Sequence, residues 1–239
     1  MSLNDLMLSR RSALGLGAAA LASLGLVACG DAEAPAPSTD EEASEETKLD
    51  AAAYDELVAS GAVAPDDVVA ASAWATAVKE AGTLRVGGVQ TSLLFSSLNE
   101  QDGVTRGFDA GLSQLLTRYI LGDETKQEIT QVTSDTRESV LQNDQVDVVF
   151  ATYSINGDRK KVISFAGPYY TTQQSILVMA DNTDINSVED LAGRNVAAQS
   201  GSTGPSILEE YAPDAIVQEF KTDEEARTAL SQGRVDAYV

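Results

Sequence analysis

Apolar and polar positions between residues 72 and 151 follow two periods in turn. Short apolar or alternating runs have the period of a strand, and longer runs with apolar residues every three to four positions have that of a helix. The strands predicted in this way lie at 84–89, 127–132 and 146–151. The helices lie at 73–81, 108–120 and 135–142. Gly82 is expected to end the first helix and Ser134 to cap the third. The apolar face predicted for the second helix consists of Phe108, Leu112, Leu115, Leu116, Tyr119 and Ile120.

The same rhythm recurs after residue 174 in shorter units. The strands predicted there lie at 175–179, 195–199, 215–220 and 235–239. The helices lie at 188–191, 204–211 and 223–232. Strands that alternate with helices at these lengths form parallel sheets covered by helices. Two such units predict an α/β fold of two lobes with a ligand cleft between them.

Residues 1–30 carry a different pattern, which is typical of an export signal. Arg10 and Arg11 precede an uncharged stretch that is too short and too rich in Gly and Ala for a spanning helix. The stretch ends in Leu-Val-Ala before Cys29 and resembles a lipobox, in which the cysteine becomes lipidated. Residues 1–28 are therefore predicted to be a signal peptide. The paired arginines fit either a twin-arginine or an ordinary Sec signal, and both alternatives stay open.

Residues 29–70 are expected to tether the globular part to this anchor. From 31 to 50 they are almost entirely Ala, Pro, Ser, Thr, Glu and Asp, which cannot bury enough apolar surface to fold. A short helix is predicted at 54–64. The predicted boundaries are 1–28 for the signal peptide, 29–70 for the acidic tether and short helix, 71–173 for lobe one and 174–239 for lobe two.

Composition narrows the chemistry that the chain can perform. Its 239 residues include 16 basic and 37 acidic side chains, and a formal net charge of −21 argues against nucleic-acid binding through a basic face. It contains no histidine, which removes Ser-His-Asp catalysis and the commonest zinc ligand. One cysteine allows neither an internal disulfide nor a cysteine-rich metal site. Neither a metal nor a cofactor is expected.

Two polar segments directly follow predicted strands, where small ligands bind in α/β folds. The first, 151–161, contains hydroxyl groups and Arg159, whose planar guanidinium suits a carboxylate. The second, 199–204, precedes a helix whose free N–H groups form an anion site. Taken alone, each segment is better explained as an ordinary turn or N-cap. Only together do they indicate a ligand site.

Several motifs in order along the chain resemble the extracellular solute-binding proteins of amino-acid ABC transporters. In lobe one they are Gly-Thr-Leu-Arg-Val-Gly at 82–87, Gly-Phe-Asp at 107–109 and Asn-Gly-Asp-Arg at 156–159. In lobe two they are Asp-Leu-Ala-Gly-Arg-Asn-Val at 190–196, Gly-Ser-Thr at 201–203 and Gly-Arg-Val-Asp-Ala at 233–237. Segments 151–155 and 165–170 are most similar to the glutamate-binding lipoproteins of this family. The resemblance implies a type II periplasmic-binding-protein fold, with parallel-rich sheets and a hinge.

The resemblance also implies roles for individual residues. The Arg159 guanidinium and the N–H of Thr203, beside Ser202, would hold the ligand α-carboxylate from opposite lobes. Arg137, at the start of a helix that faces the cleft, is the candidate for binding a side-chain carboxylate. A solvated arginine at a helix start is its alternative interpretation.

Three further residues complete the implied site. Thr152 and Ser154 would bond the α-carboxylate and the α-ammonium group, with help from the Ala151 carbonyl. The family often carries an aromatic or acidic residue in the loop after the first strand. In the corresponding loop here, 90–95, only Phe95 could pack on a ligand. Asn156 also replaces a frequent Thr.

The family's aspartate for the α-ammonium group would follow the last predicted strand, beyond Val239. We therefore expect a C-terminally truncated member with an incomplete second lobe, lacking the return segments of lobe one. Asp236 precedes that position and is interpreted as structural.

The expected function is capture of an amino acid, with glutamate as the first candidate, between two closing lobes. The chain would be exported, anchored through Cys29 at the outer face of the cytoplasmic membrane, monomeric, and a partner of ABC permease subunits. A ligand-sensing receptor domain and a dehydratase on the same fold are the alternatives. The dehydratase would need a general acid or base in the cleft, and neither polar segment offers a histidine or an obvious carboxylate.

Overall fold

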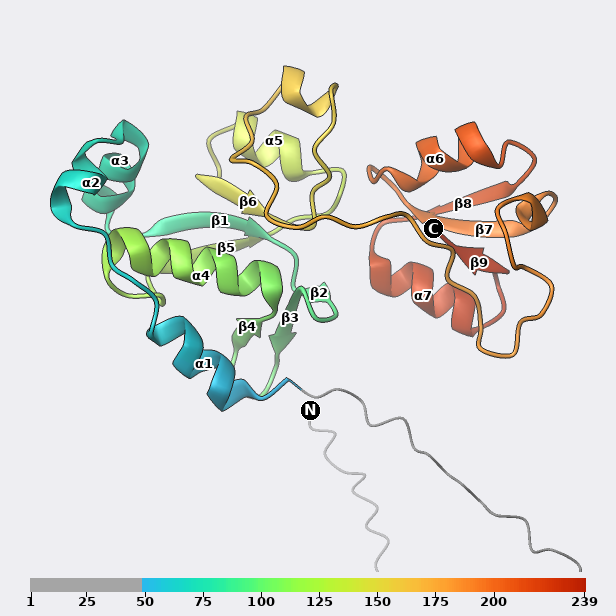
Figure 1. Ribbon diagram of the computed structural model, residues 1–239, viewed down its shortest axis with the longest axis horizontal. Coiled ribbons are helices and arrows are strands. Elements are labelled where there is room, and N and C mark those ends of the chain that lie inside the picture. The colour runs from blue at the N-terminus through green and yellow to red at the C-terminus, as the bar shows by residue number, and fades with distance from the viewer. Residues whose placement is uncertain (1–48) are drawn as a thin grey trace, which may run out of the picture. The chain divides into compact units, whose positions relative to one another are not determined.

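A computed structural model describes residues 49–239 of the chain (Figure 1). The predicted signal peptide, the lipidation site Cys29 and residues 29–48 of the predicted tether lie outside the described residues. Within 49–239, no helix is long and apolar enough to cross a membrane.

Lobe one is built on a parallel sheet with the strand order β5-β1-β6. Its strands are β1 Leu84–Gly88, β5 Gln127–Gln131 and β6 Val148–Phe150. The helices around it are α3 Ala73–Ala81, α4 Phe108–Leu121 and α5 Arg137–Gln142. Val86 of β1 pairs with Ile129 on one side and Val148 on the other, so β1 is the central strand. α4 and α5 lie on opposite faces of this sheet (Figure 1).

The ends of two helices differ in how well the sequence predicted them. Gly82 ends α3 with a φ of 72°, a left-handed conformation that glycine adopts without strain, as expected. α5 begins at Arg137, two residues later than predicted, and Ser134 does not cap it. Ser134 instead lies in the loop before the helix, where it lines a cavity described below.

The buried face of α4 is polar, and the predicted apolar face is therefore wrong in part. Phe108 and Tyr119 are 43% and 40% exposed, whereas Ser113 and Thr117 are buried. The Ser113 hydroxyl donates to the Ala110 carbonyl, and the Thr117 hydroxyl donates to the Ser113 carbonyl. Because these hydroxyls are satisfied within the helix, the small side chains can be buried without the cost of an unpaired polar group.

A small antiparallel sheet after β1 was not predicted. It consists of β2 Thr91–Ser92, β3 Ser96–Asn99 and β4 Val104–Arg106. These strands have only two to four residues each and carry few apolar side chains, so they lack the alternation that identifies a strand from sequence.

The N-terminal helix of the described chain is part of the packed fold. It spans α1 Ala51–Ala59, rather than the predicted 54–64, and α2 Asp66–Ala70 follows it. The Tyr54 hydroxyl donates to the Gln114 side chain on α4 at 2.8 Å. Asp55 accepts two hydrogen bonds from the Arg106 guanidinium, each at 2.7 Å. These contacts fix α1 against both α4 and β4.

Lobe two repeats the parallel arrangement with the strand order β8-β7-β9. Its strands are β7 Asn195–Gln199, β8 Ile216–Phe220 and β9 Ala237–Tyr238. Its helices, α6 Gly204–Tyr211 and α7 Asp223–Ser231, lie on opposite faces of the sheet (Figure 1). The predicted strand at 175–179 is wrong, because that segment forms only a single bridge between Leu177 and Tyr238.

The remaining helical elements of residues 49–239 are single turns. The 3₁₀ turns are η1 Arg159–Lys161 and η2 Glu189–Leu191.

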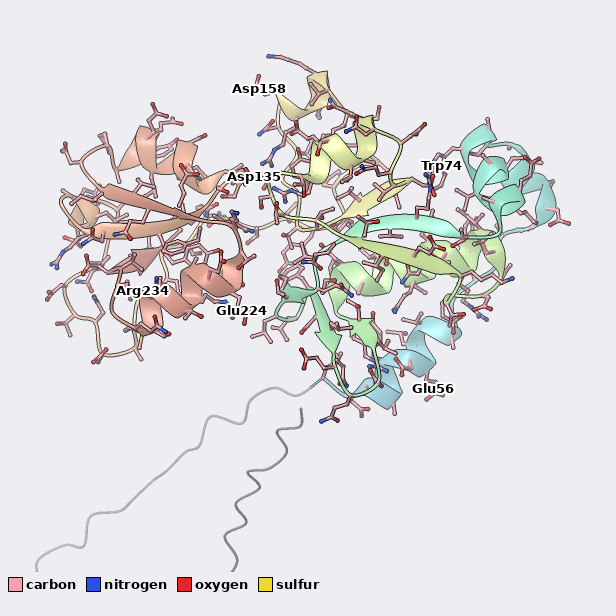
Figure 2. The ribbon with its side chains drawn as sticks, turned by 180° about the vertical axis from the view of Figure 1, so that it is seen from behind. Glu56, Trp74, Asp135, Asp158, Glu224 and Arg234 are labelled. Atoms are coloured by element: carbon pink, nitrogen blue, oxygen red, sulfur yellow. The ribbon has the colours of Figure 1, made fainter. Side chains whose placement is uncertain are left out.

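Trp74, the one tryptophan of the chain, is 41% exposed on α3 (Figure 2).

We expect Asp55→Ala to lower the free energy of unfolding by about 1 kcal/mol, because it removes two charge-assisted hydrogen bonds from a buried guanidinium. The Arg106 side chain is 8% exposed and Asp55 is 51% exposed, which limits the effect. Urea denaturation measures the change, and Glu56→Ala, at an exposed neighbouring position, is the control.

The same pair has a pH dependence. The hydrogen bonds from Arg106 lower the pKa of Asp55. Its contribution is therefore present above the unfolded-state pKa near 3.9 and is lost as the pH falls through the lower folded-state pKa. The difference in stability between wild type and Asp55→Ala should shrink below about pH 4. A difference that stays constant down to pH 2 contradicts the assignment.

Candidate functional site

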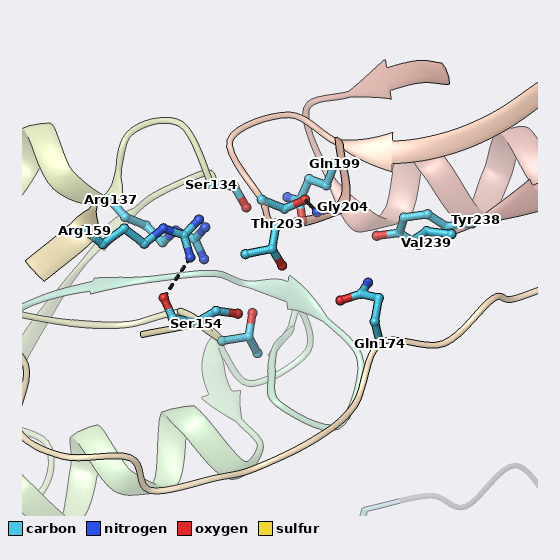
Figure 3. Close-up of a pocket in the computed structure, with 12 residues that line it drawn as sticks. Ser134, Arg137, Ser154, Arg159, Gln174, Gln199, Thr203, Gly204, Tyr238 and Val239 are labelled. Atoms are coloured by element: carbon cyan, nitrogen blue, oxygen red, sulfur yellow. Dashed lines mark hydrogen bonds between the residues drawn. The ribbon is translucent and has the colours of Figure 1, made fainter. Parts of the chain in front are cut away.

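A cavity of about 190 Å³ lies where the two polar segments singled out from the sequence come together (Figure 3). Predicted residues that line it are Arg137, Thr152, Ser154, Arg159, Ser202 and Thr203. Gln199 and Gly204, from the predicted segment 199–204, also line it, and the lining residues that were not predicted are Ser134, Gln174, Tyr238 and Val239. No acidic side chain is among these lining residues. A second cavity of about 170 Å³ shares Ser134, Thr152, Gln199 and Tyr238 with it, so the two adjoin.

Two buried guanidinium groups dominate one wall of the cavity. Arg137 and Arg159 are 3% and 8% exposed. Their guanidinium carbons lie 4.1 Å and 4.2 Å from the centre of the Tyr153 ring, within the range of a cation–π interaction. Figure 3 shows the two side chains next to each other, with Thr203 on the other side of the cavity.

Backbone carbonyls supply the hydrogen-bond acceptors for both groups. Arg137 donates to the Ala151 carbonyl at 2.8 Å, and Arg159 donates to the Ser154 carbonyl at 2.8 Å. Each also donates to the Gly201 carbonyl, at 3.4 Å from Arg137 and 2.9 Å from Arg159. The two guanidinium groups thus converge on one oxygen of lobe two.

Burial and mutual repulsion make it unfavourable for both arginines of this wall to carry a positive charge. Burial, and to a smaller extent the charge of Arg159, lower the pKa of Arg137 to about 10. The Tyr153 hydroxyl donates to the Glu138 carboxylate, and burial together with this bond raises the pKa of Tyr153 to about 12. An anion placed in the cavity would reduce the repulsion between the arginines.

The N-terminal end of α6 forms the facing wall. Thr203 is its N-cap residue, and Pro205 follows in the first turn. No residue within 49–239 accepts a hydrogen bond from the Thr203 N–H. A free N–H at a helix N-terminus is a donor suited to an anion.

The other two predicted residues lie outside this cavity. Ala151 is buried and lines the adjoining one, while its carbonyl accepts from Arg137. Phe95 lines neither cavity. It packs edge-on against Phe108 and Tyr170, with ring centres 6.1 Å and 5.4 Å away.

The signal that singled out Gln199 in the segment 199–204 was also present for Tyr238, which was missed. Gln199 and Tyr238 end the parallel strands β7 and β9, and ligands bind at the carboxyl ends of such strands. Gln174 lies in a segment without regular structure, which no pattern could have placed in the site.

No group of acidic, cysteine or histidine residues suited to a metal ion occurs in the described part of the chain. The donors that line the cavity are guanidinium, hydroxyl, amide and backbone N–H groups. This arrangement can bind a small anion or zwitterion through hydrogen bonds and charge.

The loop that carries the Gly201 carbonyl lies tightly against lobe one. Gly201 has a φ of +69°, and a Cβ there would come within 2.4 Å of Asp135 Oδ1 and 2.7 Å of the Asp135 nitrogen. The Ser200 hydroxyl also donates to the Asp135 carboxylate. Only glycine therefore fits this contact without displacement of the backbone.

We expect Gly201→Ala to lower the free energy of unfolding by at least about 1 kcal/mol more than Gly193→Ala does. Both glycines have positive φ, but a Cβ at Gly193 meets nothing within 4 Å, so that variant measures the conformational cost alone. Urea denaturation of both variants gives the difference. Equal losses would mean that the loop moves freely away from Asp135.

Comparison with known proteins places the chain in a family. The sequence matches the profile of bacterial extracellular solute-binding proteins, family 3, over residues 84–238. The glutamine-binding protein of Geobacillus stearothermophilus is 40% identical over 161 residues, which are 67% of this chain and 61% of that protein. A glutamate-binding protein of Corynebacterium glutamicum is 35% identical over 145 residues, 59% of this chain and 49% of that protein. The chain thus spans less than two thirds of the length of either relative.

Among solved structures, an ancestral amino acid-binding protein that is a precursor of cyclohexadienyl dehydratase is similar to this fold. It is 34% identical, with a TM-score of 0.64 over 70% of this chain and 74% of that one. The expected type II periplasmic-binding-protein fold is confirmed, and the chain belongs to the bacterial extracellular solute-binding proteins of family 3.

Proposed function

We propose that this protein captures an amino acid outside the cytoplasm, with a preference for dicarboxylic amino acids such as glutamate, and delivers it to the permease of an ABC importer. The observation that carries this proposal is the pair of buried guanidinium groups in a cavity that the described residues 49–239 line without an acidic side chain. The relatives named as glutamine- and glutamate-binding proteins support an amino acid as the ligand.

The α-carboxylate is assigned to Arg159. Its guanidinium is fixed by the Ser154 carbonyl and by the Tyr153 ring, so little rotamer entropy is lost when it binds a ligand. The Thr203 N–H completes the anion site from lobe two, and the Ser154 hydroxyl is available to either end of the zwitterion.

The side-chain carboxylate is assigned to Arg137. A ligand with one carboxylate would leave one of two adjacent buried charges without an anionic partner, and a ligand with two would satisfy both. This charge balance favours glutamate or aspartate over glutamine. Glutamine could still bind, because its side-chain carbonyl accepts a hydrogen bond from a guanidinium.

The proposed function requires no chemical step. General acid–base catalysis needs a titratable group within hydrogen-bond reach of the reacting atom. The lining offers guanidinium, amide and hydroxyl groups, and the chain has no histidine. A dehydratase is therefore the less favoured reading, although the ancestral neighbour is a precursor of one.

Lobe closure would couple binding to transport. The Gly201 carbonyl now accepts hydrogen bonds from both arginines, so a ligand carboxylate would compete with it for the same donors. A ligand that contacts residues of both lobes shifts the population toward the arrangement in which these contacts coexist.

We propose no oligomer for this step. Export and anchoring through Cys29 remain part of the proposal and rest on the sequence alone.

We expect thermal unfolding of the purified chain to shift to a higher midpoint with glutamate or aspartate, because a ligand that binds only the folded state stabilises it by mass action. At a ligand concentration of 100 times Kd the gain is about 2.7 kcal/mol. D-glutamate and glutarate serve as controls for recognition of the α-ammonium group. A cooperative melt that no amino acid shifts would contradict the proposal.

Arg159→Ala should reduce affinity for every amino acid by about a hundredfold, since it removes a charged donor from the α-carboxylate. Isothermal titration calorimetry measures the loss. Lys160→Ala, at the adjacent exposed position, should bind like wild type. A loss of only a few-fold in Arg159→Ala would show that the carboxylate is held elsewhere.

Arg137→Gln should weaken binding of glutamate much more than binding of glutamine, by about tenfold in the ratio of the two affinities. The glutamine introduced at position 137 keeps a hydrogen-bond donor but lacks the positive charge of the arginine. Competition calorimetry with both ligands gives the ratio directly. An equal loss for both ligands would remove Arg137 from the side-chain assignment and leave it as a structural residue.

A further inference from the structure

Asp109 in the first turn of α4 is a buried carboxylate that the proposed ligand contacts do not use. It is 1% exposed, and no basic side chain within 49–239 forms a salt bridge with it. Burial raises the pKa of Asp109, although the hydrogen bond from the Thr152 N–H opposes the shift, and the other carboxylate oxygen, Oδ1, has no hydrogen-bond partner within 49–239. An uncompensated buried carboxylate is costly, so its position calls for a specific role.

The main contact of this carboxylate is distant in sequence and close to the cavity. Asp109 Oδ2 accepts a hydrogen bond from the Thr152 N–H at 2.6 Å. That distance is short, as expected for a charge-assisted bond. The carboxylate therefore binds the backbone at the carboxyl end of β6 rather than only supporting its own helix.

Thr152 adopts a strained backbone conformation. Its φ is +46°, a left-handed value that is unusual for a β-branched residue. Such strain persists only where surrounding contacts fix it, and it is frequent in binding sites. Here it occurs at a residue that lines the cavity and directly follows Ala151, whose carbonyl accepts from Arg137.

We infer that Asp109 is a positioning residue for ligand capture. Through the Thr152 N–H it holds the strained turn that presents Thr152 to the cavity and directs the Ala151 carbonyl at Arg137. Loss of this bond would let the turn relax to negative φ, which would move both groups. The inference rests on the proposed function for its consequence in affinity, but its effect on the backbone does not.

A double-mutant cycle on the full chain tests this role. Asp109→Ala should lower affinity for the best-bound amino acid about tenfold, because it removes a charge-assisted hydrogen bond to the site. Thr152→Gly is the second single variant of the cycle, and its affinity is the reference for the double variant. It removes the strain, since glycine adopts positive φ without strain. In that background, Asp109→Ala should cost about threefold or less. Asp109→Asn keeps an acceptor oxygen and should recover most of the affinity.

The controls separate positioning from general destabilisation. Ser113→Ala alters another buried residue of α4 that does not line the cavity, and should lower stability without changing affinity. If Asp109→Ala costs the same in both backgrounds, or lowers only stability, the inference is overturned.

A ligand-independent readout keeps this test distinct from that of the proposed function. The same four proteins are compared by urea denaturation, where the losses from Asp109→Ala and Thr152→Gly should be non-additive. If wild type binds no amino acid but this coupling is present, the proposed function fails and the positioning of Thr152 stands. Additive losses in urea would overturn the inference whatever the ligand.

Discussion

Two positive charges held against one tyrosine ring form the constraint on which the site depends. Arg137 and Arg159 repel each other and are both withheld from water, so the fold must compensate for them. The groups in direct contact with them carry partial charges: the face of Tyr153 and the carbonyls of Ala151, Ser154 and Gly201. Partial charges orient the guanidinium groups without neutralising them, which leaves the cavity ready for an anion.

The arrangement of the carbonyls follows from the topology. Ala151 comes directly after β6, and the loop with Gly201 comes directly after β7. β7 is the central strand of its parallel sheet, and β6 lies beside the central strand β1 of the other. The carboxyl ends of parallel strands lie at the same edge of their sheet. A parallel sheet in each lobe thus delivers a turn to the same cavity, and both turns have a residue with positive φ, which is strained at Thr152 and unstrained at Gly201.

The sequence predicted those features that depend on local pattern. Apolar runs identified the strands of both parallel sheets, and the carboxyl ends of those strands identified Arg159 and the segment with Thr203. It failed where tertiary packing decides the outcome. The polar buried face of α4 depends on hydrogen bonds from hydroxyl groups within the helix. The short strands β2 to β4 depend on pairing with one another. Phe95 packs against other aromatic rings and not in the cavity. Gln174 reaches the cavity from a segment without regular structure.

The position of Trp74 limits how the molecule can report on its own state by fluorescence. The one indole of the chain lies on α3, and no residue of that helix lines either cavity. Emission from tryptophan would therefore follow the integrity of lobe one and remain silent when the cavity is filled. Tyr153, in contact with both guanidinium groups, and Tyr238, which lines both cavities, are the chromophores whose absorption would respond to a change of charge in the site. Occupancy would thus be visible in tyrosine difference spectra and invisible in the conventional tryptophan signal.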